Sequence, residues 1–354
     1  FDMGAMAIMP FVGKTDTERR SAINTIAPHW DGNQVWFITA GGALFAAWPM
    51  VYAVAFSGLY WALLLVLFAL FLRPVGFDYR SKLENTTWRN AWDWALCIGG
   101  AVPALVFGIA FGNLFLGIPF NLDDTLRSTY SGSFFGLLNP FALLCGVVSL
   151  SMLCAHGGSW LMLRTEGDLY KRAARATRYM SIIFLMGFIV AGVWLFMGHI
   201  NGYSFASHIN TNAALNPLAK VVVTTANPGW MNNYHTYPVT LLAPLIAILG
   251  ALLATGGSVI NKAGLSFTGT SLSIIGCILT AGFALFPFLL PSSVQPNSSL
   301  TLWDAVSSQK TLGVMTIAAC FFVPLILLYT TWSYYKMWGV ITNQHVESHS
   351  HHLY

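Results

Sequence analysis

Charged residues are the scarcest class in this sequence. Lys, Arg, Asp and Glu together make up 8% of the 354 residues, whereas soluble domains contain about 25%. So few charges cannot cover a water-facing surface, which excludes an ordinary soluble protein. Hydrophobic residues make up 56% of the chain, and the mean hydropathy is +0.62. The composition therefore places the chain in a lipid bilayer.

Familiar signatures of soluble enzymes are missing as well. The sequence has no P-loop, no glycine-rich dinucleotide motif, no HExxH zinc motif and no nucleophile motif. Its five cysteines lie within or beside apolar stretches and form no CxxC pair. We interpret them as core thiols that form neither disulfides nor metal ligands. The basic residues lie at helix ends on one side, so we expect no nucleic-acid partner.

Long stretches without charge indicate the membrane crossings. Residues 32–72 contain no Lys, Arg, Asp, Glu or His, and one helix of that length would be about twice as long as the hydrocarbon core is thick. The stretch must fold back, and Ser57-Gly58 is the natural turn. Lipid offers no hydrogen-bond partners, so the backbone N–H and C=O groups of each span must bond to one another. This predicts an all-α, polytopic membrane protein. The eight expected spans are 33–56, 59–76, 93–117, 134–156, 178–199, 239–257, 265–290 and 312–335.

The start of the chain suggests a further helix. Residue 1 is Phe, no signal peptide is visible, and residues 1–11 resemble the end of an apolar element. We expect a ninth helix, which precedes residue 1. The expected organisation is a first helix bundle at 1–156, a basic cytoplasmic connection at 157–177, a second bundle at 178–335 and a cytoplasmic tail at 336–354.

Lys and Arg set the expected orientation. Fourteen of the seventeen lie in the connections at 1–32, 73–92, 157–177 with Arg178 at its edge, 258–264 and 336–354. The alternate connections contain Arg127, Lys220 and Lys310. Because cytoplasmic connections carry the excess of positive charge, we place the first group, and the C-terminus, in the cytoplasm.

The segment 27–36 is the most informative part of the chain. His29, Asp31 and Gln34 stand here at the start of a long apolar run. Ionisable groups beside hydrocarbon are costly to desolvate, so a functional site is the default hypothesis. A carboxylate with a histidine at one membrane face can take up protons. The alternative is that Asp31 only caps a helix and interacts with its dipole.

Three further ionisable residues adjoin the hydrocarbon on the same side. Asp2, Arg73 and Asp93 are flanked by apolar or aromatic neighbours and could lie near Asp31. For Asp93 we favour a helix cap. Arg73 precedes Pro74, so it either marks a helix end and snorkels or, paired with Asp31, belongs to a charged site.

No histidine is expected at the middle of a span. His156 and His199 stand at expected span ends, and a haem site in a helix bundle normally takes axial ligands from mid-helix. Without a histidine partner, Met152, Met186 and Met197 are better interpreted as core residues. We therefore expect no haem and no metal in this chain. Four histidines near the C-terminus (His345, His349, His351 and His352) could bind a metal weakly, but a disordered tail is the preferred interpretation.

Several sequence strings resemble subunit II of the cytochrome bd quinol oxidases, including their cyanide-insensitive relatives. The family has a further helix before the first of these strings, which agrees with the helix expected before residue 1. The strings are FDMG at 1–4, DTERR at 16–20, APHWDGNQVW at 27–36, RPVGFDYR at 73–80, WRNAWDW at 88–94, FPF at 286–288 and LWD at 302–304.

The resemblance implies a bacterial respiratory complex in the cytoplasmic (inner) membrane. Subunit I of such oxidases holds haems b and d, oxidises quinol and reduces dioxygen to water, with protons drawn from the cytoplasm, which generates proton motive force. Subunit II is haem-free, and each subunit forms two four-helix bundles plus a peripheral helix. Some members bind a structural quinone in subunit II. Expected partners are subunit I, small single-helix accessory subunits, membrane lipids and the quinol at subunit I.

The resemblance also assigns a role to the polar segment. Asp31 matches an acid in the family's proton-conducting region, and Asp2 lies in another family string. The candidate proton path comprises Asp31, His29, Arg73, Asp2, Gln34 and Asp93. Two other functions stay open: a secondary transporter or channel, which a nearly charge-free midplane disfavours, and a structural scaffold without a proton role.

Overall fold

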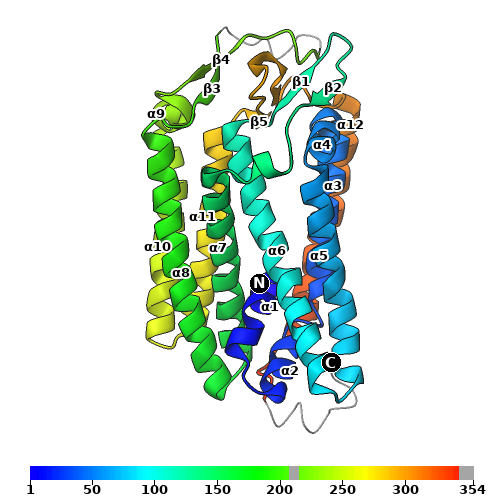
Figure 1. Ribbon diagram of the computed structural model, residues 1–354, viewed down its shortest axis with the longest axis vertical. Helices are drawn as coiled ribbons and strands as arrows, with labels where there is room; N and C mark the ends of the chain where they lie inside the picture. Colours follow the sequence, from blue (N-terminus) through cyan, green and yellow to red (C-terminus); the bar gives the residue numbers. More distant parts are fainter. Residues whose placement is uncertain (207–214, 343–354) are drawn as a thin grey trace.

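The computed structural model describes residues 1–206 and 215–342. Long helices run side by side over most of its length (Figure 1). Seven of them are long and apolar enough to cross a membrane, and each coincides with a predicted span, which confirms the all-α polytopic fold. These helices are α5 (Tyr60–Tyr79), α6 (Thr86–Leu116), α7 (Pro140–Arg164), α8 (Gly167–Phe196), α10 (Leu242–Val259), α11 (Ala263–Leu285) and α12 (Gln309–Lys336).

The first predicted span, 33–56, is divided into two helices. α3 (Trp30–Ala47) ends at Trp48, and α4 (Pro49–Gly58) begins directly after it. Pro49 explains the break, because proline lacks an N–H and keeps the preceding residue out of helical conformation. The chain then reverses between Gly58 and Tyr60, the start of α5, where the sequence predicted a turn.

The predicted connection at 157–177 is wrong. α7 continues to Arg164, α8 begins at Gly167, and Thr165 and Glu166 alone lie between the two helices. Hydropathy placed the basic residues of this region in a connection. They lie instead within the ends of two long helices, α7 and α8.

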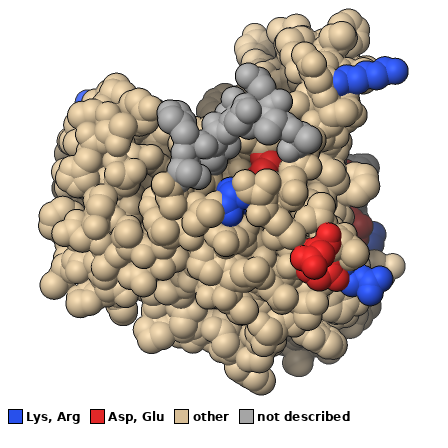
Figure 2. Space-filling model, turned by 90° about the horizontal axis from the view of Figure 1, so that it is seen from above, with Lys and Arg blue, Asp and Glu red and all other residues tan. Residues whose placement is uncertain are grey.

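The two ends of the bundle differ. One end, called here the basic end, carries α2 (Asp16–Asn24), the 3-10 helix η1 (Arg80–Lys82), the α7–α8 turn and the end of α12 (Figure 1). The opposite end, the strand end, carries short antiparallel pairs and exposes few charged residues (Figure 2). The pairs are β1 (Phe120–Leu122) with β2 (Ser128–Tyr130), β3 (Gly202–Phe205) with β4 (Val222–Thr225), and β5 (Phe288–Leu290) with β6 (Leu300–Thr301).

Short helices complete the connections at the strand end. They are the 3-10 helices η2 (Phe135–Leu137), η3 (Gly229–Met231), η4 (Pro238–Leu241) and η5 (Pro296–Ser298), and the helix α9 (Asn232–Thr236). Figure 1 shows one of them, α9, next to β3 and β4.

A short apolar helix, α1 (Asp2–Val12), lies in the interior between α6 and α7 (Figure 1). Glycines allow this close approach. A Cβ on Gly4 would lie 1.7 Å from the carbonyl oxygen of Leu153, and one on Gly157 would lie 2.0 Å from the backbone N of Ala5. The packing buries Asp2, the first residue of α1, in the protein interior.

α7 contacts α1 and α6 on one side and α8 and α11 on the other, so it joins the two halves of the bundle. α12 is peripheral: none of its residues is buried within the described chain, and its main helix contact is with α3.

Candidate functional site

A buried ion pair joins α1 to α5 near the basic end. Arg73 is 0% exposed, and its Nη2 donates to Oδ2 of Asp2 at 2.7 Å. The backbone N–H of Met3 donates to the other carboxylate oxygen of Asp2 at 2.8 Å. The guanidinium also lies 5.7 Å from the ring centroid of Trp30, the first residue of α3. The pair is costly to break, because loss of one partner leaves a buried charge alone.

This geometry corrects two interpretations of Arg73. Its ion-pair partner is Asp2, so pairing with Asp31 is wrong. Arg73 also does not mark a helix end or snorkel, because it is fully buried and α5 continues beyond Pro74 to Tyr79.

Several buried polar atoms at this end have no partner among the described residues. Those around the Asp2–Arg73 pair and the start of α3 are Nε and Nη1 of Arg73, Nε2 of His29 and Oε1 of Gln34. A buried donor or acceptor left unpaired costs about 1–3 kcal/mol. Polar atoms of this kind are normally satisfied by ordered water. This part of the basic end is therefore a polar region of the protein interior, with His29 as its titratable member.

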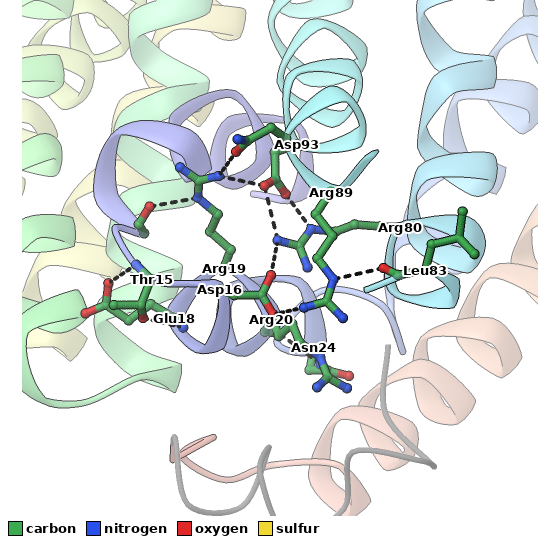
Figure 3. Close-up of polar contacts among 12 residues, drawn as sticks. Thr15, Asp16, Glu18, Arg19, Arg20, Asn24, Arg80, Leu83, Arg89 and Asp93 are labelled. Carbon is green, nitrogen blue, oxygen red and sulfur yellow. Dashed lines mark hydrogen bonds and ion pairs between the residues drawn. The ribbon is translucent and has the colours of Figure 1, made fainter. Parts of the chain in front are cut away.

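Asp93 belongs to a second charged group on the same end (Figure 3). Its carboxylate is 1% exposed and accepts from Arg80 Nε at 2.5 Å, from Arg80 Nη2 at 3.1 Å and from Arg19 Nη1 at 2.7 Å. The predicted helix cap is wrong: α6 begins at Thr86, and Asn85 caps it by accepting from the backbone N–H groups of Thr87 and Trp88. Asp93 is an ion-pair partner inside the helix.

The short helix α2 connects this group to three other helices (Figure 3). Asp16 accepts from Arg80 at 2.9 Å and from Arg89 at 2.8 Å, and Glu18 pairs with Arg172 of α8. Burial acts to raise the pKa of Glu18, but hydrogen bonds from the backbone N–H groups of Lys14 and Thr15 and from Arg172 hold this pKa below its ordinary value. Through these ion pairs the two acids fix α2 against its neighbours.

His29 lies just outside the first turn of α3 and is 5% exposed. Its ring stacks on Tyr334 of α12 with centroids 4.1 Å apart and meets Trp160 of α7 edge-on at 6.1 Å. Burial, with a smaller contribution from the charge of Arg164, lowers the pKa of His29 to about 4. The imidazole is therefore neutral at pH 7 and can accept a proton only as a transient carrier.

Asp31 and Gln34 lie on α3 beside this group. Asp31 is exposed in the first turn of α3, and none of the described residues forms a hydrogen bond or ion pair with its side chain. His29, not Asp31, is the N-cap residue. Gln34 is half-buried. Asp31 therefore stands apart from the Asp2–Arg73 pair on a face that the chain itself leaves uncovered.

His156, which the sequence placed at the end of a span, lies further inside its helix than predicted. Because α7 runs to Arg164, His156 lies inside the helix, with Nδ1 2.9 Å from Oγ1 of Thr270 and its ring stacked on Phe267 at 4.7 Å. A haem iron needs an inward-facing ring nitrogen with open space beyond it. Packing against Thr270 and Phe267 does not suit that role.

Metal-binding clusters are not found within 1–206 and 215–342: no group of three or more His, Cys, Asp or Glu gathers there. All five cysteines are free. The terminal residues His345, His349, His351 and His352 lie outside the described residues.

A cleft of about 610 Å³ lies at the strand end beside the α4–α5 turn. Its size falls within the usual range for small-molecule sites, about 300–1,000 Å³. Five of its twelve lining residues are aromatic: Tyr60, Trp61, Tyr130, Phe134 and Phe135. It is the candidate place for a flat apolar ligand.

Sequence reasoning missed most of the ion-pair partners. Asp16, Arg19, Arg80 and Arg172 were noted only as basic residues or as parts of family strings. The concentration of two acids and two bases at 16–20, in a chain with 8% charge, is the signal that could have indicated this group.

Comparison with known proteins agrees with the fold. A family model described as cytochrome bd terminal oxidase subunit II matches residues 1–337. The chain is 53% identical over 354 residues, all of this chain and 93% of the relative, to the cytochrome bd-I ubiquinol oxidase subunit 2 of Escherichia coli K12. It is 33% identical over 339 residues, 95% of this chain and 89% of the relative, to the cytochrome bd ubiquinol oxidase subunit 2 of Bacillus subtilis.

A solved structure of the bd oxidase from Geobacillus thermodenitrificans has the same fold. It matches with a TM-score of 0.61 and 15% identity, covering 94% of this chain and 91% of that one. The membrane helices and these relatives together identify a polytopic subunit of a respiratory quinol oxidase. The chain belongs to the cytochrome bd terminal oxidase subunit II family.

Proposed function

We propose that this chain is the haem-free partner of a haem-bearing subunit I and delivers protons to it from the cytoplasm. The observation that carries the proposal is the buried Asp2–Arg73 pair. The Nε and Nη1 groups of Arg73 have no partner among the described residues, and unpaired atoms of His29 and Gln34 lie at the same end. Ionisable groups inside a membrane protein mark ion or proton pathways by default.

Asp31 is the proposed entrance. Its carboxylate has no partner within the described chain, and it stands on an α3 face that another molecule must cover. A carboxylate facing hydrocarbon is unfavourable, which supports a position against subunit I or a water-filled gap between the subunits. Asp2, Arg73, His29 and Gln34 would line the path, and Asp93 would fix its surroundings through the ion pairs of α2.

The proposed membrane is the bacterial inner membrane, with the basic end in the cytoplasm. The excess of Lys and Arg at this end supports the orientation, including a cytoplasmic C-terminus. We keep the sequence-based division into a first bundle at 1–156 and a second at 178–335 as part of the proposal, with α7 as the joining helix. Haems b and d and the quinol would lie in subunit I.

The aromatic cleft at the strand end is the proposed place for a structural quinone. Its size and its rings, including Tyr60 and Trp61, support a flat apolar ligand. Single-helix accessory subunits and lipids would cover the remaining apolar surface, of which α12 offers the largest exposed part.

Asp31→Asn tests the proton-delivery proposal. The substitution keeps the shape of the side chain but cannot carry a proton as a carboxylate does. We expect quinol oxidase turnover of the purified complex to fall about tenfold or more while haem content stays normal. Unchanged turnover would contradict a proton role and leave a structural one, and a large loss of haem would indicate a role in assembly.

A further inference from the structure

α12 is attached to the described chain mainly at its two ends. None of its residues, Gln309–Lys336, is buried. At the strand end, the backbone N–H of Ser307 donates to the carbonyl oxygen of Ala47 at 2.7 Å. The attachment at the basic end is much more elaborate, and it falls on the five residues that follow the helix.

Arg164, the last residue of α7, holds this segment. It is almost fully buried, and its Nε and Nη2 donate to the carbonyl oxygens of Gly339 and Met337 at 2.7 and 2.8 Å. The backbone N–H of Ile341 donates in return to the carbonyl oxygen of Arg164 at 2.8 Å. Hydrogen bonds from a charged donor are stronger than those between neutral groups.

Two tryptophans enclose the guanidinium. The Arg164 carbon Cζ lies 5.3 Å from the ring centroid of Trp160 and 5.2 Å from that of Trp338. Arginine is suited to such a site because its planar, weakly hydrated head stacks on aromatic faces and donates in fixed directions. Lysine could reproduce the charge but not this planar contact.

The last turn of α12, directly before this segment, covers His29. Tyr334 lies on the imidazole at 4.1 Å, with the ring planes 8° apart, and its hydroxyl donates to Oδ1 of Asn33 at 3.0 Å. Trp160 meets both His29 and Tyr334 edge-on, at 6.1 Å in each case. The segment clamped by Arg164 and the residue that covers His29 therefore belong to one packed unit.

A simpler interpretation is that Arg164 only caps the end of a helix, as basic residues often do. Three observations go beyond a cap. The arginine comes from a different helix, one of its two partners, Gly339, lies beyond the C-cap residue Met337, and an aromatic contact connects it to His29 through Trp160.

We propose that Arg164 is a positioning residue that clamps the segment after α12 and thereby keeps Tyr334 over His29, which closes this side of the basic end to water. An effect of the clamp on turnover rests on the proposed proton-entry function, but the clamp itself does not. Arg164 of α7 and the hydroxyl of Tyr334 of α12 face His29, and Asp2 of α1 lies nearby. Release of the clamp would therefore expose the imidazole to water among charged and polar groups.

Arg164→Leu in the purified two-subunit complex tests the clamp. The first readout is hydrogen–deuterium exchange of the Ile341 amide, which the clamp protects, and we expect it to speed up on the order of tenfold or more. The second is modification of His29 by diethyl pyrocarbonate, which needs solvent access to the ring. We expect it to rise by a similar factor, while exchange within α10 and α11 stays unchanged.

Matched variants separate the clamp from general destabilisation. Arg175→Leu removes an exposed arginine of α8 at the same end and should change neither readout. Arg164→Lys should restore protection only in part. If Arg164→Leu does not assemble, Trp338→Leu keeps both hydrogen bonds, removes one stacking face and should raise both readouts by a smaller factor.

Wild-type protection of Ile341, or unchanged His29 modification, in the variant that assembles would overturn the proposal. Turnover of the same variants reports on proton entry alone, so the two proposals can fail separately.

Discussion

The two ends of this bundle bury polar groups in different ways. At the basic end, charged side chains from distant helices meet in the interior, as Asp2 with Arg73 and Asp93 with Arg80 do. At the strand end, polar groups are paired by the backbone hydrogen bonds of short strand pairs and by neutral hydroxyls such as that of Ser298. The Lys220–Asp304 pair, at 2.6 Å, is the charged exception there among the described residues.

The difference shows where the protein accepts an energetic cost. Neutral hydrogen bonds would hold helix ends together at lower cost than buried charges, because each buried ion loses its hydration. The strand end uses this less costly solution, whereas the basic end keeps ionisable groups. That contrast favours a function in which protons enter at the basic end.

The largest effect is expected from Arg73→Met. The substitution leaves the Asp2 carboxylate buried without its partner, which costs about 3–5 kcal/mol. We expect a strong loss of assembled complex and a lower midpoint of thermal unfolding. The double variant with Asp2→Asn should recover much of that loss, because no buried charge then remains. A double variant as damaged as the single one would contradict the ion-pair account.

A smaller effect is expected from Lys220→Met at the strand end. Asp304 keeps some exposure and the hydrogen bond that it accepts from the backbone N–H of Thr301, so we expect a cost of about 1–3 kcal/mol. Thermal unfolding of the complex measures this cost, and turnover should stay normal. If Lys220→Met lowered turnover as Asp31→Asn should, the contrast between the two ends would fail.

The pH dependence of stability should report on His29. Its pKa is about 4 in the folded protein and near 6.5 ordinarily, so between these values the unfolded chain binds the proton and the folded chain does not. Stability should therefore fall as the pH drops from about 6.5 toward 4. Thermal midpoints at pH 7.5 and 5.5 measure this, and His29→Gln should show a weaker pH dependence. An identical dependence in the variant would exclude His29 as its source.

The smallest effect is expected from Asp168→Asn. Asp168 and Lys171 form a pair on the surface of α8 at 3.0 Å, where both side chains are exposed to solvent. Surface pairs of this kind contribute little. We expect no measurable change in unfolding midpoint or turnover, so the variant serves as the control for every substitution at the basic end.

Hydropathy predicted the long helices of this fold correctly because lipid requires long apolar helices whatever their neighbours are. It failed where a helix leaves the lipid. The residues 157–177 are polar enough for a connection, yet they extend α7 and α8, and this error also placed His156 at a span end. The break at Pro49 was visible in the sequence as a proline, but hydropathy does not register it.

The candidate site was predicted in its residues but not in its pairings. Asp2 and Arg73 are separated by 71 positions, and Arg19 and Asp93 by 74, so only the packing of α1 and α2 brings each pair together. The glycines that allow α1 to enter the interior, such as Gly4, were not informative before their neighbours were known. Asp31 alone kept the position that the sequence predicted, at the exposed start of an apolar helix.

Proton uptake by the two-subunit complex tests the central claim most directly. The measurement is the rate of proton uptake from the side of the basic end after an oxygen pulse, in vesicles with Asp31→Asn and, as control, Asp168→Asn. The account predicts slow uptake with normal haem content for Asp31→Asn and wild-type uptake for Asp168→Asn. Wild-type uptake in both variants would contradict proton entry through this subunit.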